Sequence, residues 1–391
     1  MGLVIWGFDM RRSLILLLGM AMGFGGISAC SNMGMLPLHT TGLNQVGDKP
    51  IVTMEDNSLF GLVNEIASRR VVYIGETHDR YDHHLNQLAV IKRLHQQGVE
   101  LAIGMEFFQR PSQQHLDDYI SGEIDEKRLL KLSGYYRNWG YDFRLYRPIL
   151  EFARRHDIAL VALNAPSGLV GQVSEKGFGE VDDEWRAMLP EIQLPANAAY
   201  KDRLRRVFEM HSGADRDFDR FLQVQLLWDE YMAESAAAYL KRHPNRKLVV
   251  LAGSGHVAEG TGIPQRVQLR VPVPYTVLTS VDPGSDRISD ADHLLLASGE
   301  RLPAAGKLGL YIREVDEGVT VHRWVRERSS GIQRVIPGDL ISHIAGERIR
   351  SMEDVRLAML DRLPGEQVWV ELERGRDEGK RKKVTAVIEL I

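Results

Sequence analysis

The sequence predicts an α/β domain with a largely parallel sheet flanked by helices, followed by a smaller, β-rich C-terminal domain. Two observations favour this fold class. From about residue 51 to 282, short apolar runs alternate with longer stretches of helical periodicity, which is typical of successive strand–helix–strand units. From about 303 to 391 the pattern changes to short strands around one helix.

The start of the chain has the features of an exported, lipid-anchored protein. Two arginines precede a short apolar run, and the run leads to Ile27-Ser28-Ala29-Cys30, which resembles the lipobox of bacterial lipoproteins. We therefore expect residues 1–29 to be a signal peptide and Cys30 to carry the lipid. The lipid would hold the protein in the cell envelope, at the outer membrane facing the periplasm. The sequence does not decide whether translation starts at Met1 or Met10.

Composition limits the remaining possibilities. Cys30 is the only cysteine, so an intrachain disulfide and a thiolate ligand are excluded. The net charge is −4 without a long basic block, which argues against nucleic acid as a partner. Residues 30–50 lack periodicity and are predicted to be the lipidated cysteine with a flexible tether, and residues 283–302, rich in Asp, Ser and Gly, are predicted to be a linker.

The α/β domain is expected to contain five buried strands with helices between them. The predicted strands are Val71-Ile74, Leu101-Met105, Ile158-Leu163, Leu248-Ala252 and Tyr275-Thr279. A long helix is predicted from about Asp217 to Arg242, because apolar residues form one stripe along it and His243-Pro244 ends it.

Reactive side chains follow three of these strands. Glu76 and His78 follow the first, Glu106 follows the second, and His256 follows the fourth within Gly253-Ser254-Gly255-His256. Because the carboxyl ends of parallel strands meet at one edge of a sheet, we expect these side chains to converge. Histidine and glutamate are metal ligands and general acids or bases. The pattern therefore predicts a site for a divalent metal, with Glu76 and Glu106 as the catalytic residues if the protein is a hydrolase.

A second candidate region is the aromatic segment from Tyr135 to Pro148, in which arginines are interleaved. One interpretation is a packed loop or lid that leads into a helix around Ile149. The other is a haem-binding face, with a tyrosinate as axial ligand and arginines that meet the acidic groups of the cofactor. The candidate residues for that face are Tyr135, Tyr136, Tyr141 and Arg144.

Several motifs lie in order along the α/β domain: Ile74–His78, Gly104–Phe108, Trp139–Pro148, Gln225 with Trp228-Asp229 and Met232-Ala233, and Gly253–His256. Together they resemble one family, the ChaN family of haem-binding lipoproteins associated with iron uptake. The resemblance implies haem as the cofactor. It also implies an alternative, because the related Tiki and TraB proteins are linked to metal-dependent proteolysis through paired Gly-x-x-His motifs and acidic residues. The site residues that it implies are Glu76, His78, Glu106 and His256.

The C-terminal segment resembles a PDZ domain. Leu308-Gly309-Leu310 is similar to the carboxylate-binding loop, Pro337-Gly338-Asp339 matches a common turn of the bacterial type, and residues 351–360 would form the groove helix. Ser351 with Asp354 is a suitable start for that helix. The resemblance implies that the loop amides bind a peptide C-terminus while the peptide adds as a strand.

The sequence therefore predicts a membrane-anchored lipoprotein that binds haem, for iron uptake or haem handling, with a PDZ-like domain that docks a partner or peptide. The alternative is a metal-dependent hydrolase or peptidase. A third interpretation is a scaffold that works mainly through its C-terminal domain. The sequence leaves open which residue ligates the haem iron, which metal binds, which peptide is recognised, and whether the protein is a homodimer.

Overall fold

The computed structural model describes residues 45–46, 49–211, 217–257, 261–285, 291–325, 334–377 and 380–391. The predicted signal peptide, Cys30 and most of the predicted tether lie outside them. Among the described residues, no helix combines the length and the apolar character needed to cross a membrane. The chain divides into an α/β unit, which reaches Asp125 and resumes from Tyr141 to Arg301, and a C-terminal unit, which combines Glu126–Gly140 with Leu302–Ile391.

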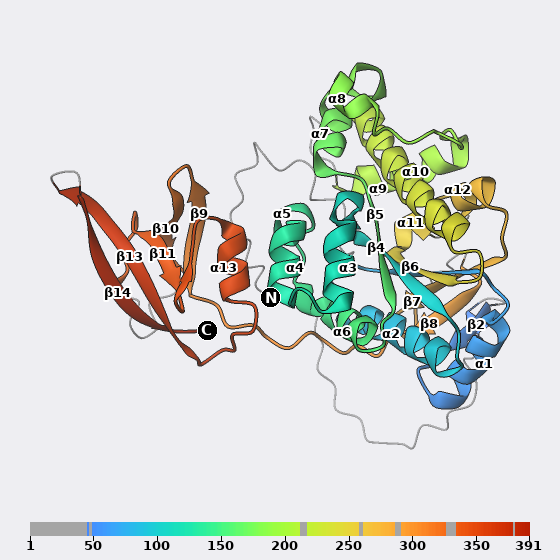
Figure 1. The fold of residues 1–391 in the computed structure, drawn as a ribbon, viewed down its shortest axis with the longest axis horizontal. Helices are drawn as coiled ribbons and strands as arrows, with labels where there is room; N and C mark the ends of the chain where they lie inside the picture. The colour runs from blue at the N-terminus through green and yellow to red at the C-terminus, as the bar shows by residue number, and fades with distance from the viewer. Residues whose placement is uncertain are drawn as a thin grey trace, which may run out of the picture. The chain divides into compact units, whose positions relative to one another are not determined.

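The α/β unit is built on a sheet in the order β1-β2-β8-β7-β3-β6-β4-β5, in which every pair is parallel except β1 with β2 (Figure 1). The strands are β1 Gln45–Val46, β2 Lys49–Val52, β3 Val71–Glu76, β4 Leu101–Gln109, β5 Ala159–Asn164, β6 Lys247–Gly253, β7 Tyr275–Val281 and β8 His293–Leu296. The predicted α/β class with a largely parallel sheet is confirmed, and the five predicted strands correspond to β3 to β7.

Helices cover the sheet on both faces (Figure 1). They are α1 Asp56–Ile66, α2 Tyr81–Gln96, α3 Gln113–Ser121, α6 Arg147–Arg155, α7 Ser167–Lys176, α8 Asp183–Arg186, α9 Ala198–His211, α10 Phe218–Arg242, α11 Ser254–Val257 and α12 Ile263–Arg270. The long predicted helix is α10, which starts where the Asp217 side chain accepts hydrogen bonds from the amides of Asp219 and Arg220.

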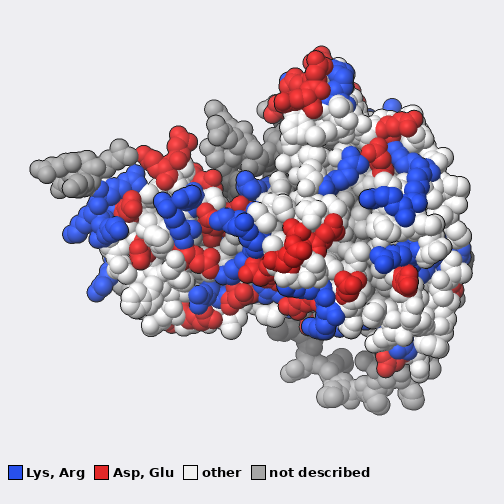
Figure 2. All heavy atoms as spheres, in the orientation of Figure 1, with Lys and Arg blue, Asp and Glu red and all other residues white. Residues whose placement is uncertain are grey.

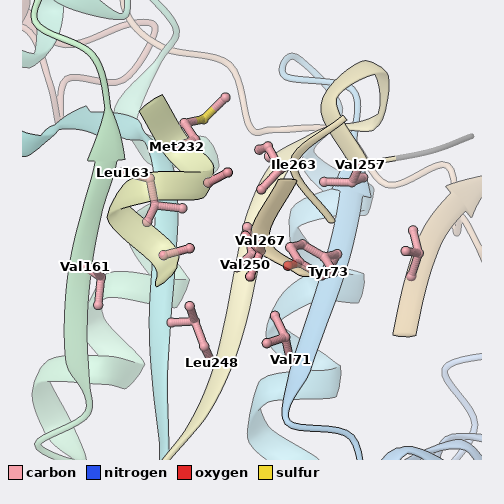
Figure 3. Close-up of a cluster of buried hydrophobic side chains, with 14 of the residues drawn as sticks. Val71, Tyr73, Val161, Leu163, Met232, Leu248, Val250, Val257, Ile263 and Val267 are labelled. Carbon is pink, nitrogen blue, oxygen red and sulfur yellow. The ribbon is translucent and has the colours of Figure 1, made fainter. Parts of the chain in front are cut away.

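The core on one face of the sheet lies between the strands and helices α10 and α12. Alternate residues of the strands, such as Val71 and Tyr73 of β3 and Leu248 and Val250 of β6, point into it (Figure 3). On the other face, the side chain of Gln87 from α2 donates to the Ile74 carbonyl at 3.0 Å. Because both faces are covered, the strands read as continuous apolar runs, and polar side chains are left at the strand ends.

Three parts of the chain differ from the predicted domain boundaries. Within the predicted tether 30–50, Gln45–Val46 forms β1, which pairs with the start of β2. Within the predicted linker 283–302, His293–Leu296 forms β8, which pairs with β7 and β2 in the sheet. Within the predicted α/β domain, Glu126–Gly140 folds with the C-terminal unit. The α/β sheet therefore extends beyond residue 282, and the C-terminal unit recruits a segment from far upstream.

The C-terminal unit contains a six-stranded antiparallel sheet in the order β14-β13-β11-β10-β9, with β12 beside β11. Its elements are α4 Glu126–Ser133, α5 Tyr135–Asn138, β9 Leu310–Val315, β10 Gly318–Trp324, β11 Leu340–Ile344, β12 Glu347–Arg348, α13 Met352–Ala358, β13 Gln367–Asp377 and β14 Lys380–Glu389. At the start of α13, Ser351 and Asp354 form a reciprocal capping box, as their spacing predicts.

Paired charges support this unit alongside its apolar core. Asp339, which is fully buried, accepts two hydrogen bonds from Arg374 at 2.8 and 2.9 Å and a third from the Ile336 amide at 2.9 Å. The Pro-Gly-Asp turn is thus fixed by a bidentate ion pair.

Over the face of the molecule drawn in Figure 2, acidic and basic side chains are interspersed rather than sorted by sign.

Candidate functional site

The structure brings Glu76, His78, Glu106 and His256 together at the carboxyl ends of three neighbouring strands. Strand β6 lies between β3 and β4 and is parallel to both. Glu76 is the last residue of β3, Glu106 lies in β4, and His256 lies in the short helix α11 that follows β6. Together with Asp229, these residues are called the strand-end cluster below.

Glu76 and His78 form the tightest pair of the cluster. Nδ1 of His78 lies 2.5 Å from Oε1 of Glu76, and Nε2 of His84 lies 3.9 Å from the other oxygen. Burial by itself lowers the pKa of His78, but the charges of Glu76 and Glu106 raise it to about 9. Burial favours the neutral form of Glu76, but the nearby imidazoles lower its pKa below the usual value. Without a ligand, the pair is therefore a buried imidazolium–carboxylate pair at neutral pH.

Glu106 links the two histidine turns. Its Oε2 accepts a hydrogen bond from the Gly253 amide at 2.7 Å, and its Oε1 lies 3.5 Å from Nε2 of His256. The position of Gly253 allows no side chain, because a Cβ there would lie 2.9 Å from Cε1 of His78. The first glycine of the Gly-x-x-His turn is thus required by the close approach of an imidazole.

Asp229 is a member of the cluster to which the sequence assigned no role. Its Oδ1 lies 2.6 Å from Nδ1 of His256, and its Oδ2 accepts a hydrogen bond from the Tyr200 hydroxyl at 2.7 Å. Asp229 is 1% exposed, and Arg266, which is fully buried, lies 4.0 Å away. A carboxylate at Nδ1 leaves Nε2 of His256 directed to Glu106 or to a ligand.

The aspartate–histidine pair also affects the charge of His256. Burial by itself lowers the pKa of His256, but Glu106 and Asp229 together raise it above the usual value. The sequence did hold a sign that Asp229 has a role. It is an acidic residue next to Trp228, which lies on the apolar stripe of the long predicted helix. It lies on α10 and not at a strand end, so the strand-end argument could not find it.

The donor set of the cluster suits a cation. Ligand atoms of Glu76, His78 and Glu106 all lie within 4.8 Å of one another. These residues are buried and combine one imidazole with two carboxylates, and both groups are ligands of Zn²⁺ and other divalent metals. With a water or substrate in an open position, such a site can polarise a carbonyl or activate a water molecule.

The residues of the candidate haem face are divided between the two units. Tyr135 and Tyr136 belong to the C-terminal unit, whereas Tyr141 and Arg144 belong to the α/β unit. Tyr135 is 1% exposed, so its hydroxyl is not accessible to an iron in this conformation. Arg144 is already paired with Asp142, at 2.7 Å between Nη2 and Oδ2.

Tyr141 contacts the strand-end cluster. It is half-buried, and the centroid of its ring lies 5.1 Å from that of His78. Burial raises the pKa of Tyr141 above its usual value, and the negative charges of Glu76, Asp79 and Glu106 raise it further. Its phenol is therefore neutral in the protein without a bound cation.

The candidate peptide-binding loop leads into an edge strand. Leu308 and Leu310 are buried at 5% and 4% exposure, and Gly309 between them has a φ of +69°, which favours glycine. Strand β9 follows and pairs with β10. Among the strands that the structure describes, none pairs with its other edge. That edge has the backbone groups that an added strand would need.

Comparison with known proteins gives one family and several distant structural likenesses. A family model described as haem-binding uptake, Tiki superfamily, ChaN matches residues 62–267. The ChaN structure from Campylobacter jejuni, which concerns cofacial haem binding, is 18% identical and covers 60% of this chain and 89% of its own, with a TM-score of 0.48. A variant erythromycin esterase in its open conformation is 16% identical, with 59% and 74% coverage and a TM-score of 0.38.

A third solved structure aligns with a smaller part of the chain. The HtrA-type protease AlgW with a decapeptide is 18% identical and covers 22% of this chain and 30% of its own, with a TM-score of 0.19. No curated protein matches the chain. Because the family match spans more than half of the 391 residues, the protein belongs to the ChaN family of haem-binding uptake proteins in the Tiki superfamily.

Proposed function

We propose that this protein is a lipid-anchored, haem-binding protein of the cell envelope that takes haem at the rim of the strand-end cluster. Membership of the ChaN family supports haem as the ligand. The observation that carries the location is the contact of Tyr141 with His78, at 5.1 Å between ring centroids. The half-buried phenol of Tyr141 can ligate iron. It lies beside the buried carboxylates of the cluster, which can accept the proton that the phenol releases.

Tyr141 fits a haem as an iron ligand, whereas Arg144 does not fit it as a partner for the propionates. Phenolate is an axial ligand that haem iron accepts, and Tyr141 is half-buried rather than enclosed. The propionates need cations, and Arg144 is engaged by Asp142 and does not offer an uncompensated charge. When bound, haem would supply a ferric ion whose charge favours the phenolate. Tyr141 must release its proton on binding, because its pKa is raised in the free protein.

Hemin titration tests this proposal on the chain from Ser31 onward, prepared without detergent. We expect saturable binding with a shifted Soret band. Tyr141→Phe keeps the ring against His78 and removes only the hydroxyl, so it should weaken binding by about tenfold or more and change the spectrum. Tyr136→Phe is the matched control, because it removes a tyrosine hydroxyl from the same predicted segment. Unchanged binding and spectrum in Tyr141→Phe would rule out Tyr141 as the ligand.

A second candidate function, a metal-dependent hydrolase or peptidase, is favoured by the cluster itself. Three ligand atoms lie within 4.8 Å, and Asp229 holds His256 as it would hold a general base. Elemental analysis of the purified chain, with Glu76→Gln beside it, tests this function. It predicts one equivalent of a divalent metal that the variant loses. A chain without stoichiometric metal, whose Glu76→Gln form behaves like the parent, would remove this candidate.

We also propose that the protein is anchored through Cys30 and docks a peptide at its C-terminal unit. The lipobox-like sequence supports the anchor, and the loop Leu308-Gly309-Leu310 before the edge strand β9 supports the docking. Labelled fatty acid should enter the wild-type chain in cells and not Cys30→Ser. A library of peptides with free C-termini should yield binders that amidation of the terminus abolishes.

A further inference from the structure

The first turns of α2 bury polar side chains that usually lie in water. Among them are two adjacent histidines, His83 and His84, which are 5% and 1% exposed. The others, Asp82, Asn86 and Gln87, have hydrogen-bond partners in the protein. Burying a polar group costs free energy unless a hydrogen bond replaces the lost contact with water. Each histidine should therefore have partners too, in the protein or in a bound molecule.

His84 is engaged by the protein on both sides of its ring. Gln87 donates to the Ile74 carbonyl at 3.0 Å, which leaves its amide oxygen facing Nδ1 of His84 at 3.1 Å. Nε2 of His84 lies 3.2 Å from the His78 carbonyl. Both nitrogens of His84 thus face oxygen acceptors of the protein, and this histidine holds the end of β3 rather than a ligand.

His83 uses only one of its two nitrogens in the protein. Its Nδ1 accepts a hydrogen bond from the Thr77 amide at 3.1 Å. A ring nitrogen that accepts carries no proton, so the proton of the neutral ring is on Nε2. Burial first, and then the charge of Arg80, lower the pKa of His83 to about 4. The ring is therefore neutral at neutral pH, and its Nε2 is a hydrogen-bond donor and not a metal ligand.

Nε2 of His83 is buried and has no partner among the residues that the structure describes, and the same holds for Oε2 of Glu76. Both atoms lie where α2 meets the end of β3. Thr77, whose amide donates to His83, is the residue after Glu76, and Oε2 of Glu76 lies 3.9 Å from Nε2 of His84. His83 and Glu76 are also near enough for each to shift the pKa of the other. An unpaired donor and an unpaired acceptor thus border the same small region.

The two unpaired atoms together select the kind of ligand that would fill this region. A metal ion could bind Oε2 of Glu76, but it would leave the N–H of His83 without an acceptor. An anion could accept from the N–H, but the carboxylate would repel it. A hydroxyl oxygen can accept from Nε2 and donate to Oε2 at the same time. The smallest molecule of that class is water, which typically makes about three hydrogen bonds to buried polar groups.

We propose that His83 and Glu76 hold a water molecule at the end of β3, with His83 as the donor and Glu76 as the acceptor. Such a water keeps one lone pair and one proton for a ligand at the strand-end cluster. His83 is then a positioning residue, because it acts on a bound ligand through this water. A water held against a carboxylate is also the reactant that the hydrolase candidate requires. The water site itself does not rest on haem or metal binding, since both atoms lack partners in the ligand-free protein.

Crystal structures of the ligand-free mature chain and of two variants test this proposal. His83→Phe fills the space of the imidazole and removes the donor. His293→Phe is the matched control, because His293 is also 5% exposed and lies in β8, beside Glu65. In the wild-type chain and the control we expect a water about 2.5–3.2 Å from both Nε2 of His83 and Oε2 of Glu76, and in His83→Phe we expect its loss. A dry region in the wild-type chain, or a water that keeps its place in His83→Phe, would overturn the proposal.

Nuclear magnetic resonance of the wild-type chain, isotope-labelled at the histidine nitrogens, keeps the proposal testable if His83→Phe does not fold. We expect the ring of His83 to carry its proton on Nε2 alone and that proton to show magnetisation transfer from a bound water. A proton on Nδ1, or an Nε2 proton without such transfer, would contradict the assignment. Neither experiment adds hemin or metal, so a negative result here leaves the haem and hydrolase functions to their own tests.

Discussion

The substitution Gly253→Ala tests the geometry of the strand-end cluster most directly. The added methyl carbon would lie 2.9 Å from Cε1 and 3.2 Å from Nε2 of His78. Carbon atoms in contact are normally about 3.5–4.0 Å apart, so the ring must retreat by roughly 0.6 Å or more. His78 cannot retreat without stretching its 2.5 Å contact with Glu76. The backbone itself is no obstacle, because Gly253 is not among the residues with positive φ.

We expect this clash to cost about 1–3 kcal/mol of unfolding free energy, as overpacking of a filled site does. Metal affinity, measured by competition with a chelator, should fall because the three ligand atoms no longer converge. Gly255→Ala, in the same turn, is the control: its nearest neighbour would be Nη1 of Arg203 at 3.9 Å, an ordinary contact. If Gly253→Ala matches Gly255→Ala in both urea unfolding and metal affinity, the cluster does not have the packing described here.

Two further outcomes follow from the charges of the cluster. Glu76 and Glu106 raise the pKa of His78 to about 9, above its usual value, so the imidazolium stabilises the empty fold at low pH. Stability should be fully present below about pH 6.5 and fall by up to about 3 kcal/mol as the pH rises through about 9, measured by urea unfolding. Asp229 and Glu106 raise the pKa of His256 against the effect of burial, so Asp229→Asn should lower the pKa of that imidazole, measured by NMR titration.

The buried strands and their ends could be predicted because their signal is local. Each strand from β3 to β7 is an apolar run followed at once by polar residues or glycine, and the parallel arrangement then places those residues at one edge. Strands β2 and β8 have four residues each, and β8 lies next to a segment rich in Asp and Ser. Strands so short have no periodicity to distinguish them from a linker, so the predicted boundary fell too early.

Long-range partnerships could not be predicted in the same way. Nothing local in the sequence of Glu126–Gly140 tells that this segment groups with the C-terminal unit. In the aromatic segment, Tyr135 and Tyr141 have the same chemistry, yet Tyr135 is buried and the half-buried ring of Tyr141 contacts the ring of His78. Asp229 contacts His256 across 27 positions of the chain, a distance that no local motif covers.

The grouping of Glu126–Gly140 with the C-terminal unit limits how this protein can be divided or could have been assembled. A domain that is joined end to end can be gained by one gene fusion and removed by one truncation. Here, cutting the chain at residue 302 would remove one segment of the C-terminal unit and leave its other segment, Glu126–Gly140, behind. The two units are therefore not interchangeable modules, and neither would be expected to evolve its contacts independently of the other.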